Sequence, residues 1–360
     1  MMKKTRVALV GCGKVGGLHC KAVAQIPEAE FIAVCDADSL RASKFAIEHK
    51  ALAFTTIEEM ILKAKPDVLL IATPHPLHRQ PTVAALNAGV HVLVEKPMAA
   101  SIEDCDAMIA AAKSSGATLG VISQRRFFEP VLRMKHAIDA GKIGKPLLGF
   151  FLMYSWRSLE YYSSDPWRGK WSTEGGGVLV NQSPHQLDIL RWLMGPIAEV
   201  QGYFQNLNHP GVEVEDTAVA SLRFVNGGLG SILASVSQNP GIHTKVHVHG
   251  SNGASVGVET DRGATFIAGM TSIPEPPLND VWTIPGEEKL LEGFQQEDRN
   301  AFTKIDATVH YHALQIREFV QAIREHKQPM VSAEDGRATV ELFTAIYQSS
   351  KTGTAIKLPL

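Results

Sequence analysis

The chain has 360 residues, more than a single hydrophobic core usually serves, so we expect two domains. Hydrophobic residues make up 45% of the chain and charged residues 20%, values that are typical of a globular protein and argue against extensive disorder. The 35 basic and 37 acidic residues give a formal net charge of −2, so the chain has no overall positive field, and nucleic acid is not expected as a partner.

The cysteines and the apolar runs indicate the compartment. Cys12, Cys20, Cys35 and Cys105 form no CxxC pair, which favours free thiols in a reducing compartment over a disulfide framework or a zinc site. The apolar run after the basic start is too short for a secretory signal. No stretch approaches the roughly 18 apolar residues of a membrane span. We therefore expect a cytoplasmic protein without a membrane segment.

The first predicted element is a buried strand over residues 7–10, followed by a glycine-rich turn. The strand has no polar alternation, which is typical of a parallel sheet covered on both faces. Gly11, Gly13 and Gly16 then form a GxGxxG pattern, and residues 15–26 continue at helical spacing. In this context the glycines permit a tight turn, the close approach of a pyrophosphate and close helix packing, while the helix N-terminus offers amides and a positive dipole end.

A second predicted strand covers residues 31–35. It is followed directly by Asp36, which lies 20 residues after Gly16. An acidic side chain at this place accepts hydrogen bonds from a ribose 2′-hydroxyl and repels a 2′-phosphate, so it favours NAD over NADP. A glycine turn alone would be a weak signal. Strand, helix and acid in register predict a dinucleotide site.

Two further strands, over 68–72 and 90–94, alternate with predicted helices, which indicates a doubly wound parallel sheet, a Rossmann fold. Ligands bind beyond the carboxyl ends of such strands, where the loops 73–78 and 95–97 follow. On its own Lys96 would be taken for a solvated surface lysine. Its place at a strand end, directly before Pro97, favours a position at the edge of the cofactor cleft.

The motifs GCGKVGGLH, Asp36, ATPHPLH and VLVEKPMA resemble those of the glucose-fructose oxidoreductase / inositol dehydrogenase / rhizopine catabolism (Gfo/Idh/MocA) family, and the similarity runs essentially end to end. The resemblance implies that Lys96 lies beside the nicotinamide and takes part in catalysis, and that Glu95 and His78 help to hold the cofactor. It also implies a cis bond between Lys96 and Pro97. His75 stands where the family commonly has asparagine. The expected cofactor-binding residues are Gly11, Gly13, Lys14, Val15, Gly16, Asp36, Thr73, Pro74, His75, His78, Glu95, Lys96 and Pro97.

From residue 124 the pattern changes to short alternating runs separated by glycine and proline turns, which predicts an antiparallel sheet. Residues 273–300 are rich in Pro, Gly, Asp and Glu and are expected to form a surface excursion. We expect a Rossmann domain over 1–123 and an α+β domain over 124–360, with C-terminal helices able to pack back on the first domain. The resemblance implies a large, mostly antiparallel open sheet with helices on one face, and a homodimer or homotetramer formed through the other face.

The second candidate site follows Gly175-Gly176-Gly177. Asn181, His185 and Asp188 recur at i, i+4 and i+7, on one polar side of a helix if that helix begins before Pro184. A single histidine on an apolar helix is more often a satisfied core group. The family motif GGGxLxDxGxHxxD implies instead that His185 lies in the substrate pocket. Asn181 and Ser183 depart from the aspartate and glycine common there, and asparagine can orient a hydroxyl but cannot take a proton.

Two catalytic schemes stay open at this point, with Lys96, His185 and Asn181 as the candidate catalytic residues. In the preferred scheme His185 removes the hydroxyl proton as hydride leaves for nicotinamide C4, and Lys96 stabilises the developing alkoxide. In the other scheme Lys96 accepts the proton. Histidine needs less adjustment than lysine to act near neutral pH.

Aromatic residues and arginines gather in residues 154–171, which hold three of the five tryptophans. Aromatic faces that stack on sugar C–H surfaces, with arginines that bond hydroxyl or carboxylate oxygens, suit a polyol or sugar ring. Packing of the sheet or of a subunit contact would explain the same rings about equally well. The expected substrate-binding residues are Lys96, Arg126, Trp156, Arg157, Trp167, Arg168, Asn181 and His185.

Together these patterns predict an NAD-dependent oxidoreductase acting on a secondary alcohol or ketone of a sugar, polyol or sugar derivative. Two alternatives stay open: a glycosidase or sugar-modifying enzyme that uses transient oxidation by bound NAD, and a non-catalytic nucleotide-sensing protein. His243, His247 and His249 include a same-face pair on a predicted strand. No carboxylate or cysteine joins them at ligand spacing, so no metal site is expected.

Overall fold

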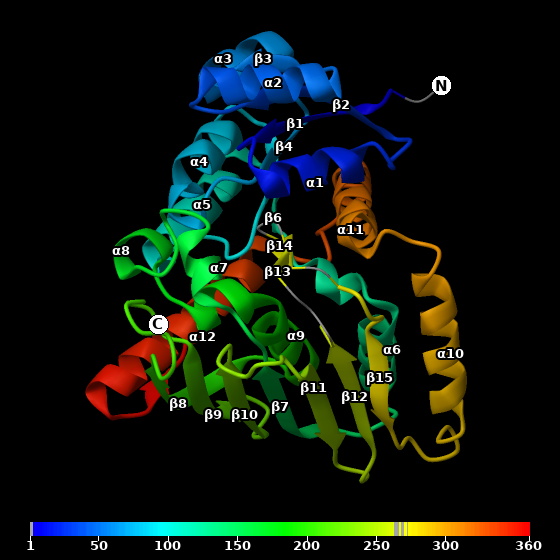
Figure 1. Ribbon diagram of the computed structural model, residues 1–360. Helices are drawn as coiled ribbons and strands as arrows, with labels where there is room; N and C mark the ends of the chain where they lie inside the picture. Colours follow the sequence, from blue (N-terminus) through cyan, green and yellow to red (C-terminus); the bar gives the residue numbers. More distant parts are fainter. Residues whose placement is uncertain (1–2, 263–265, 268–269, 272) are drawn as a thin grey trace. The chain divides into compact units, whose positions relative to one another are not determined.

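The computed structural model describes residues 3–262, 266–267, 270–271 and 273–360 (Figure 1). The chain divides into two compact units. Unit 1 comprises Met1–Gln124 and Thr308–Val340, and unit 2 comprises Arg125–Ala307 and Glu341–Leu360. The stretch 124–360 that the sequence assigns to one domain is therefore shared between the two units.

Unit 1 is built on a six-stranded sheet in which all neighbouring strands are parallel. The strand order is β3-β2-β1-β4-β5-β6, which is the order of a Rossmann fold, with the switch point between β1 and β4. Every residue of β4 is buried, which explains its lack of polar alternation. The predicted Rossmann sheet is confirmed. Its strands are β1 (Thr5–Val10), β2 (Ala29–Cys35), β3 (Leu52–Phe54), β4 (Val68–Ile71), β5 (His91–Val94) and β6 (Leu119–Val121).

Short polar side chains cap several helices of unit 1. Thr56 accepts a hydrogen bond from the backbone N–H of Glu59, and Ser101 accepts one from that of Asp104. Helix α1, in contrast, begins after Gly13 without a side-chain cap. The helices are α1 (Lys14–Val23), α2 (Ser39–His49), α3 (Ile57–Ala64), the 3₁₀ turn η1 (His75–Leu77), α4 (Arg79–Asn87), α5 (Ile102–Ser115) and α11 (Ala307–Arg324).

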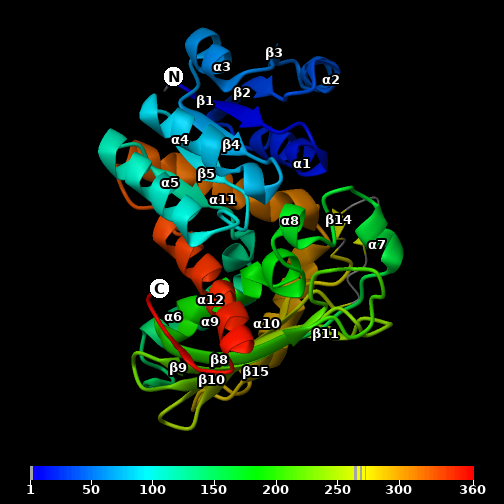
Figure 2. The same ribbon diagram turned by 90° about the vertical axis from the view of Figure 1, so that its left-hand side faces the viewer.

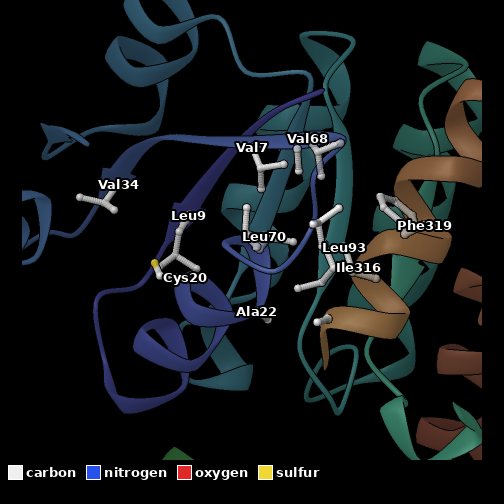
Figure 3. Packing of buried hydrophobic residues seen from close by; sticks show 14 of the residues in the cluster. Val7, Leu9, Cys20, Ala22, Val34, Val68, Leu70, Leu93, Ile316 and Phe319 are labelled. Atoms are coloured by element: carbon white, nitrogen blue, oxygen red, sulfur yellow. The ribbon is translucent and has the colours of Figure 1, made fainter. Parts of the chain in front are cut away.

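Helix α11 completes the hydrophobic core of unit 1. Its Ile316 and Phe319 are buried in the same cluster as Leu93 of β5, as Figure 3 shows. The side chain of Gln315 accepts a hydrogen bond from the N–H of Ser123 at 3.0 Å and donates one to the carbonyl of Val121 at 2.8 Å. This apolar face and these hydrogen bonds are the physical reason that residues 308–340 belong with the nucleotide sheet.

Unit 2 contains an eight-stranded sheet in the order β15-β12-β11-β7-β10-β9-β8-β16. Its neighbours are antiparallel except for β7 and β10, which are parallel, so the predicted mostly antiparallel sheet is confirmed. Its strands are β7 (Pro146–Tyr154), β8 (Ile197–Gln205), β9 (Thr217–Phe224), β10 (Leu229–Ser235), β11 (His243–Gly250), β12 (Ser255–Thr260), β15 (Leu278–Trp282) and β16 (Ile356–Lys357). A separate two-stranded sheet pairs β13 (Phe266–Ile267) with β14 (Met270–Thr271).

Helices α6 and α9 lie on one face of the large sheet (Figure 2). A Cβ atom on Gly149 of β7 would lie 2.7 Å from Met194 Cγ, so this glycine allows α9 to pack closely on the sheet. The remaining helices, of which α12 contributes to both units, are η2 (Gln124–Phe127), α6 (Glu129–Asp139), α7 (Leu159–Ser163), α8 (Trp171–Glu174), the π-helical turn η3 (Val178–Gln182), α9 (Pro184–Met194), α10 (Leu290–Phe302) and α12 (Ala333–Thr352).

The surface excursion expected over residues 273–300 is wrong, because this stretch contains β15 and most of α10. Asn279 of β15 is fully buried and donates hydrogen bonds to the carbonyls of Pro130 and Gly257. Arg133 donates to Asn279 Oδ1 at 2.6 Å and pairs with Asp298 of α10. Two of the polar residues in this stretch, Asn279 and Asp298, are therefore buried and make internal hydrogen bonds.

The cysteines are free, as the sequence indicated, and all four are buried. Burial is the main cause that raises the pKa of Cys12 to about 12, so its thiol stays protonated near neutral pH. Over the described residues, no helix has both the length and the apolar character needed to cross a membrane.

Candidate active site

The glycine turn between β1 and α1 is shaped for close approach. Gly11 has φ of +100°, and a Cβ atom there would lie 2.8 Å from the nitrogen of Thr73. A Cβ atom on Gly16 would lie 2.3 Å from Gly11 O. A Cβ atom on Gly13, in contrast, would have no other group within 4 Å. Helix α1, which has no side-chain cap, begins at the next residue, Lys14. This cradle and the amides of an uncapped helix N-terminus fit a pyrophosphate.

The backbone holds Asp36 at the carboxyl end of β2. The N–H of Cys12 donates to its Oδ2 and the N–H of Asp38 donates to its Oδ1, both at 2.9 Å. The guanidinium of Arg41 lies 3.5 Å from Oδ2. The carboxylate is therefore fixed beside the glycine turn, where the sequence predicts that it meets a ribose hydroxyl.

The ring of His78 joins the loop after β4 to the loop after β5. Its Nε2 lies 2.9 Å from the carbonyl oxygen of Thr73, and its Nδ1 lies 3.1 Å from that of Pro97. Burial, the largest effect, lowers the pKa of His78, while the carbonyl contacts act in the opposite direction. In the same loop His75 is buried, and Thr73 Oγ1 is buried without a hydrogen-bond partner among the described residues. A bound cofactor would be a suitable partner for this hydroxyl.

Glu95 holds Lys96 through the backbone. The N–H of Lys96 donates to Glu95 Oε2 at 3.0 Å, and Glu95 Oε1 lies 2.8 Å from Nε2 of His19 on α1. One carboxylate thus links the lysine loop to the helix that starts at the glycine turn. The Lys96–Pro97 bond is cis, as the family resemblance implies.

Glu95 and its neighbours form a buried ionisable cluster. Burial acts to raise the pKa of Glu95, but the hydrogen bond from His19 and the charges of His19, His312 and Lys96 outweigh it and lower this pKa to about 2. Burial, with the charge of His19, lowers the pKa of His312 to about 4, and the two histidine rings lie 5.6 Å apart. The carboxylate beside Lys96 therefore stays negative throughout the neutral range.

Asn181 and His185 lie on two successive helical segments. Asn181 belongs to η3, where the N–H of Ser183 donates to the carbonyl of Val178, five residues earlier. His185 is the second residue of α9, which begins at Pro184, a residue with no N–H to donate. The condition for the i, i+4, i+7 pattern, one helix that begins before Pro184, is not met, because the helical register changes at Ser183.

The amide of Asn181 is oriented by fixed partners. Its Nδ2 donates to the hydroxyl of Tyr161 at 3.0 Å and to Glu174 Oε1. Gln182 Nε2 donates to the same hydroxyl at 2.8 Å. Burial raises the pKa of Tyr161 to about 12, so its phenol is neutral. This arrangement suits a group that orients a ligand and does not exchange protons.

Arginines and aromatic rings surround Tyr161 in unit 2. The guanidinium of Arg168 lies 4.5 Å from the Tyr161 ring centroid and 4.4 Å from that of Trp167, and it donates to the Tyr161 hydroxyl at 2.6 Å. Arg157 is buried, lies 5.5 Å from the Tyr161 ring centroid, and donates to the carbonyl of Trp156. Tyr161 therefore brings the aromatic–arginine segment together with η3.

Arg126 has an internal partner. It is fully buried, its Nε donates to Asp188 Oδ2 at 2.7 Å, and a second nitrogen reaches Oδ1. Its guanidinium lies 4.8 Å from the ring centroid of Trp192. This bidentate pair fixes α9, and a role for Arg126 in substrate binding stays a prediction.

The histidines of β11 are held by hydrogen bonds. His247 Nε2 lies 2.9 Å from Asp280 Oδ2, and His249 Nδ1 lies 2.7 Å from Ser255 Oγ. Asp280 also pairs with Lys245. Within the part of the chain that the structure describes, no group of three or more His, Cys, Asp or Glu side chains is placed to hold a metal ion.

Sequence reasoning missed several residues around these candidates. His19 was in view, because it ends the motif GCGKVGGLH. No sequence signal pointed to His312, Glu174 or Glu215. The ring of His312 packs against that of His19 from far along the chain. Glu174 reaches Asn181 through the fold of a loop, and Glu215 accepts the N–H of Gly177 from 38 positions away.

The fold and these side chains define an oxidoreductase with a nucleotide-binding Rossmann unit and an α+β unit. The family model described as "Oxidoreductase family, NAD-binding Rossmann fold" matches residues 5–123, and the "GFO/IDH/MocA C-terminal domain" model matches residues 131–256. The chain belongs to the Gfo/Idh/MocA family, as its motifs indicated. It is an NAD(P)-dependent enzyme acting on CH–OH groups.

Three relatives give the range of similarity. The crystal structure of the WlbA dehydrogenase from Bordetella pertussis in complex with NADH and UDP-GlcNAcA matches with a TM-score of 0.85 and 30% identity, over 99% of each chain. A scyllo-inositol 2-dehydrogenase (NAD(+)) of Bacillus subtilis is 26% identical over 99% of this chain and 97% of its own length. A 1-carboxy-3-chloro-3,4-dihydroxycyclohexa-1,5-diene dehydrogenase of Comamonas testosteroni is 33% identical over 62% of this chain, and the match spans 55% of that relative.

Proposed function

We propose that the protein transfers hydride between nicotinamide C4 and a secondary alcohol or ketone of a sugar, polyol or sugar derivative. The observation that carries the proposal is the buried Glu95 carboxylate, which holds Lys96 at the carboxyl end of β5 and joins it through His19 to the helix of the glycine turn. NAD supplies the hydride acceptor when it is bound, and the cradle at Gly13 fits its pyrophosphate.

The charges favour one of the two catalytic schemes. A carboxylate that stays negative beside Lys96 favours the ammonium form of that lysine, which donates a hydrogen bond to the substrate oxygen and cannot take a proton from it. Lys96 therefore stabilises the alkoxide, and His185 removes the proton. Asn181, held by Tyr161 and Glu174, orients a substrate hydroxyl.

NAD is the proposed cofactor in preference to NADP. The fixed carboxylate of Asp36 accepts ribose hydroxyls and repels a 2′-phosphate. Arg41 beside it is paired with that carboxylate, so its positive charge is partly compensated.

The proposed substrate is a ring that carries hydroxyl groups. The three relatives described above are named for an inositol, for a dihydroxycyclohexadiene and for a complex with UDP-GlcNAcA. The aromatic faces and guanidinium groups of Trp156, Arg157, Trp167 and Arg168 suit such a ring, and guanidinium groups are suitable partners for an acidic substituent. All three relatives are named as dehydrogenases, which favours net oxidation over a glycosidase or a nucleotide sensor.

The experiment is a panel of inositols, aldoses, uronates and sugar nucleotides, each incubated with NAD and followed by NADH absorbance. On the best substrate we expect His185→Ala to lose its neutral-pH activity and to regain part of it at high pH, where hydroxide replaces the base. Lys96→Met should lower kcat at every pH, because it removes the charge that stabilises the alkoxide. Full activity in both variants would overturn the assignment. Release of reducing sugar without NADH would point to the glycosidase.

We also propose that two copies of the chain associate through the open face of the unit 2 sheet. Leu152, Leu233, Val219 and Tyr203 are direct cross-strand neighbours on β7, β10, β9 and β8, so they form one row on one face. Val219 is 39% exposed and Tyr203 is 61% exposed. An apolar row of this kind on a second copy is a self-complementary partner for it.

A further inference from the structure

Glu215 lies just before β9, is only 1% exposed, and binds the entrance of the turn η3. Its Oε2 accepts the N–H of Gly177 at 2.8 Å and its Oε1 accepts the N–H of Leu179 at 3.0 Å. Its backbone carbonyl accepts the N–H of Val178 at 3.0 Å. A single residue, 38 positions away in the sequence, thus binds three successive amides.

These amides need an external partner. The first N–H groups of a helical segment have no acceptor within it, and the residue before η3 is Gly177, which has no side chain to cap them. A Cβ atom on Gly177 would lie 1.9 Å from the carbonyl oxygen of Glu215, so only glycine lets the two segments approach this closely. Glu215 therefore acts as a cap supplied by the segment that leads into β9.

Helix α12 fixes the orientation of this carboxylate. The hydroxyl of Tyr347 donates to Glu215 Oε1 at 2.7 Å. The Tyr347 ring packs edge-on against Trp171 and Phe204, with centroid distances of 5.3 and 4.8 Å. The cap is thus held rigidly by packed aromatic residues.

The next residue, Asp216, holds a second segment in the same way. Its two oxygens accept the N–H groups of Leu207 and Asn208, and Oδ2 also lies 2.7 Å from His209 Nδ1. The other ring nitrogen of His209, Nε2, lies 2.6 Å from the carbonyl oxygen of Arg157. Both Asp216 and His209 are buried, so the hydrogen bonds that link Asp216 through His209 to Arg157 are shielded from water.

We propose that Glu215 and Asp216 are positioning residues for the reaction. Glu215 sets the place of the segment that carries Asn181 and leads to His185, and Asp216, through His209, sets the loop that carries Arg157. The inference rests on the proposed function, which assigns those three residues to catalysis and substrate binding. Because the two acids are adjacent in the chain, directly before β9, they fix the spacing between the segments that they hold.

The separate roles of Glu215 and Asp216 predict different kinetic defects in the full-length enzyme. In Glu215→Gln, an amide NH₂ replaces one of the two oxygens that accept hydrogen bonds, so the entrance of η3 must shift. A displacement of about 1 Å at reacting groups typically costs about 100-fold, and we expect a loss of this order in kcat with KM changed by less than about threefold. Asp216→Asn should instead raise KM by about tenfold, with a smaller change in kcat.

Backbone amide hydrogen exchange gives a readout that does not depend on activity. In Glu215→Gln, peptides covering residues 177–183 should exchange about tenfold faster while those covering 205–210 are unchanged, and Asp216→Asn should give the reverse. Tyr347→Phe keeps the ring packing and removes one donor, so it should give a smaller defect of the Glu215→Gln kind. The matched control is Glu318→Gln in unit 1, where a part-buried glutamate accepts one N–H, from Met330, far from these segments in the sequence.

Unchanged exchange over 177–183 in Glu215→Gln would overturn the proposal, and so would faster exchange with a normal kcat, because the cap would then be only structural. A kcat loss in the Glu318→Gln control equal to that in Glu215→Gln would also overturn it. Full activity in both His185→Ala and Lys96→Met would instead contradict the proposed function. The exchange and kcat results for Glu215→Gln would still decide whether this acid positions its segment.

Discussion

The buried charge of Glu95 is tolerated because His19 and a backbone amide bind it. Replacing His19 by alanine leaves this carboxylate without its ring partner. We expect the free energy of unfolding at pH 7 to fall by about 3 kcal/mol, the usual cost of breaking a buried pair. Urea unfolding measures it. Lys63→Ala, which breaks the exposed pair with Glu59, should cost less than about 1 kcal/mol.

The pair of Glu95 and His19 also makes the free energy of unfolding depend on pH in the acid range. The pKa of Glu95 is about 2 in the folded protein, compared with its ordinary value of 4.5, which applies to the unfolded chain. The contribution of Glu95 to the stability of the fold is therefore fully present above pH 4.5 and is lost as the pH falls towards 2. The shift corresponds to about 3 kcal/mol. In His19→Ala the carboxyl protonates at higher pH, so we expect a smaller loss of stability over this window. Equal slopes in the two proteins would show that His19 does not lower this pKa.

Asp36 and Arg41 decide the choice of cofactor in our proposal. In Asp36→Ser the ribose loses a charged acceptor and Arg41 is released from its ion pair. We expect kcat/KM for NAD to fall by about tenfold or more, since hydrogen bonds to charged groups contribute roughly 1.5–3 kcal/mol. Activity with NADP should rise, and adding Arg41→Ala should reverse that gain. If Asp36→Ser keeps its preference for NAD, another residue sets it.

At the scale of an element, helix α1 offers two neighbouring glycines with opposite surroundings. A Cβ atom on Gly16 would lie 2.3 Å from Gly11 O, whereas on Gly17 the nearest atom is 4.0 Å away, on Phe45. Gly16→Ala should therefore push the helix from the turn and weaken NAD binding by at least about tenfold, measured by calorimetry. Gly17→Ala should bind NAD normally and gain up to about 1 kcal/mol, because alanine favours helix. Equal effects on binding would contradict the close packing at Gly16.

Elements with a continuous apolar run or a regular apolar pattern could be predicted from the sequence, and elements held by polar contacts could not. The buried strands β1 and β4 were visible because parallel strands covered on both faces have no polar positions. Strand β15 was missed because its Asn279 and Asp280 look like loop residues, although Asn279 is buried among hydrogen-bond partners. Pro184 suggested the break between η3 and α9, but no sequence pattern indicated that η3 is π-helical or that Glu215 accepts the N–H groups at its entrance.

For the candidate site, the sequence predicts the residues that belong to local motifs and misses those that hold them. Gly13 and Asp36 stand at offsets from strand ends that the chemistry of dinucleotide binding dictates. Lys96 was singled out by the resemblance of its EKP motif to that of the family. Glu215 and His312 meet their partners through the tertiary fold, and no spacing rule relates them to those partners. Supporting groups of this kind become visible only in the structure.

For the whole molecule, chain order and structural units do not coincide. The sequence of unit 1 is interrupted by residues 125–307, and its core is completed by α11. Phe319 fits against Gly120 of β6, where a Cβ atom would lie 2.8 Å from its ring. The nucleotide unit therefore depends on a helix that is synthesised late, so we infer that its core forms only after most of the chain is available.

Self-association is the prediction that concerns the whole molecule most directly. Val219 lies in the apolar row of the open sheet face, with Leu233 and Tyr203 as its cross-strand neighbours. In Val219→Glu each copy would place a charge against the same apolar row of the other, and a buried unpaired charge costs several kcal/mol. We expect light scattering to find a monomer for this variant and an oligomer for the unchanged protein, with similar thermal unfolding of each unit, since Val219 is partly exposed. Ile47→Glu, at an 82% exposed apolar residue on α2, is the matched control and should leave the mass unchanged. A Val219→Glu protein that keeps its mass would place the subunit contact on another surface.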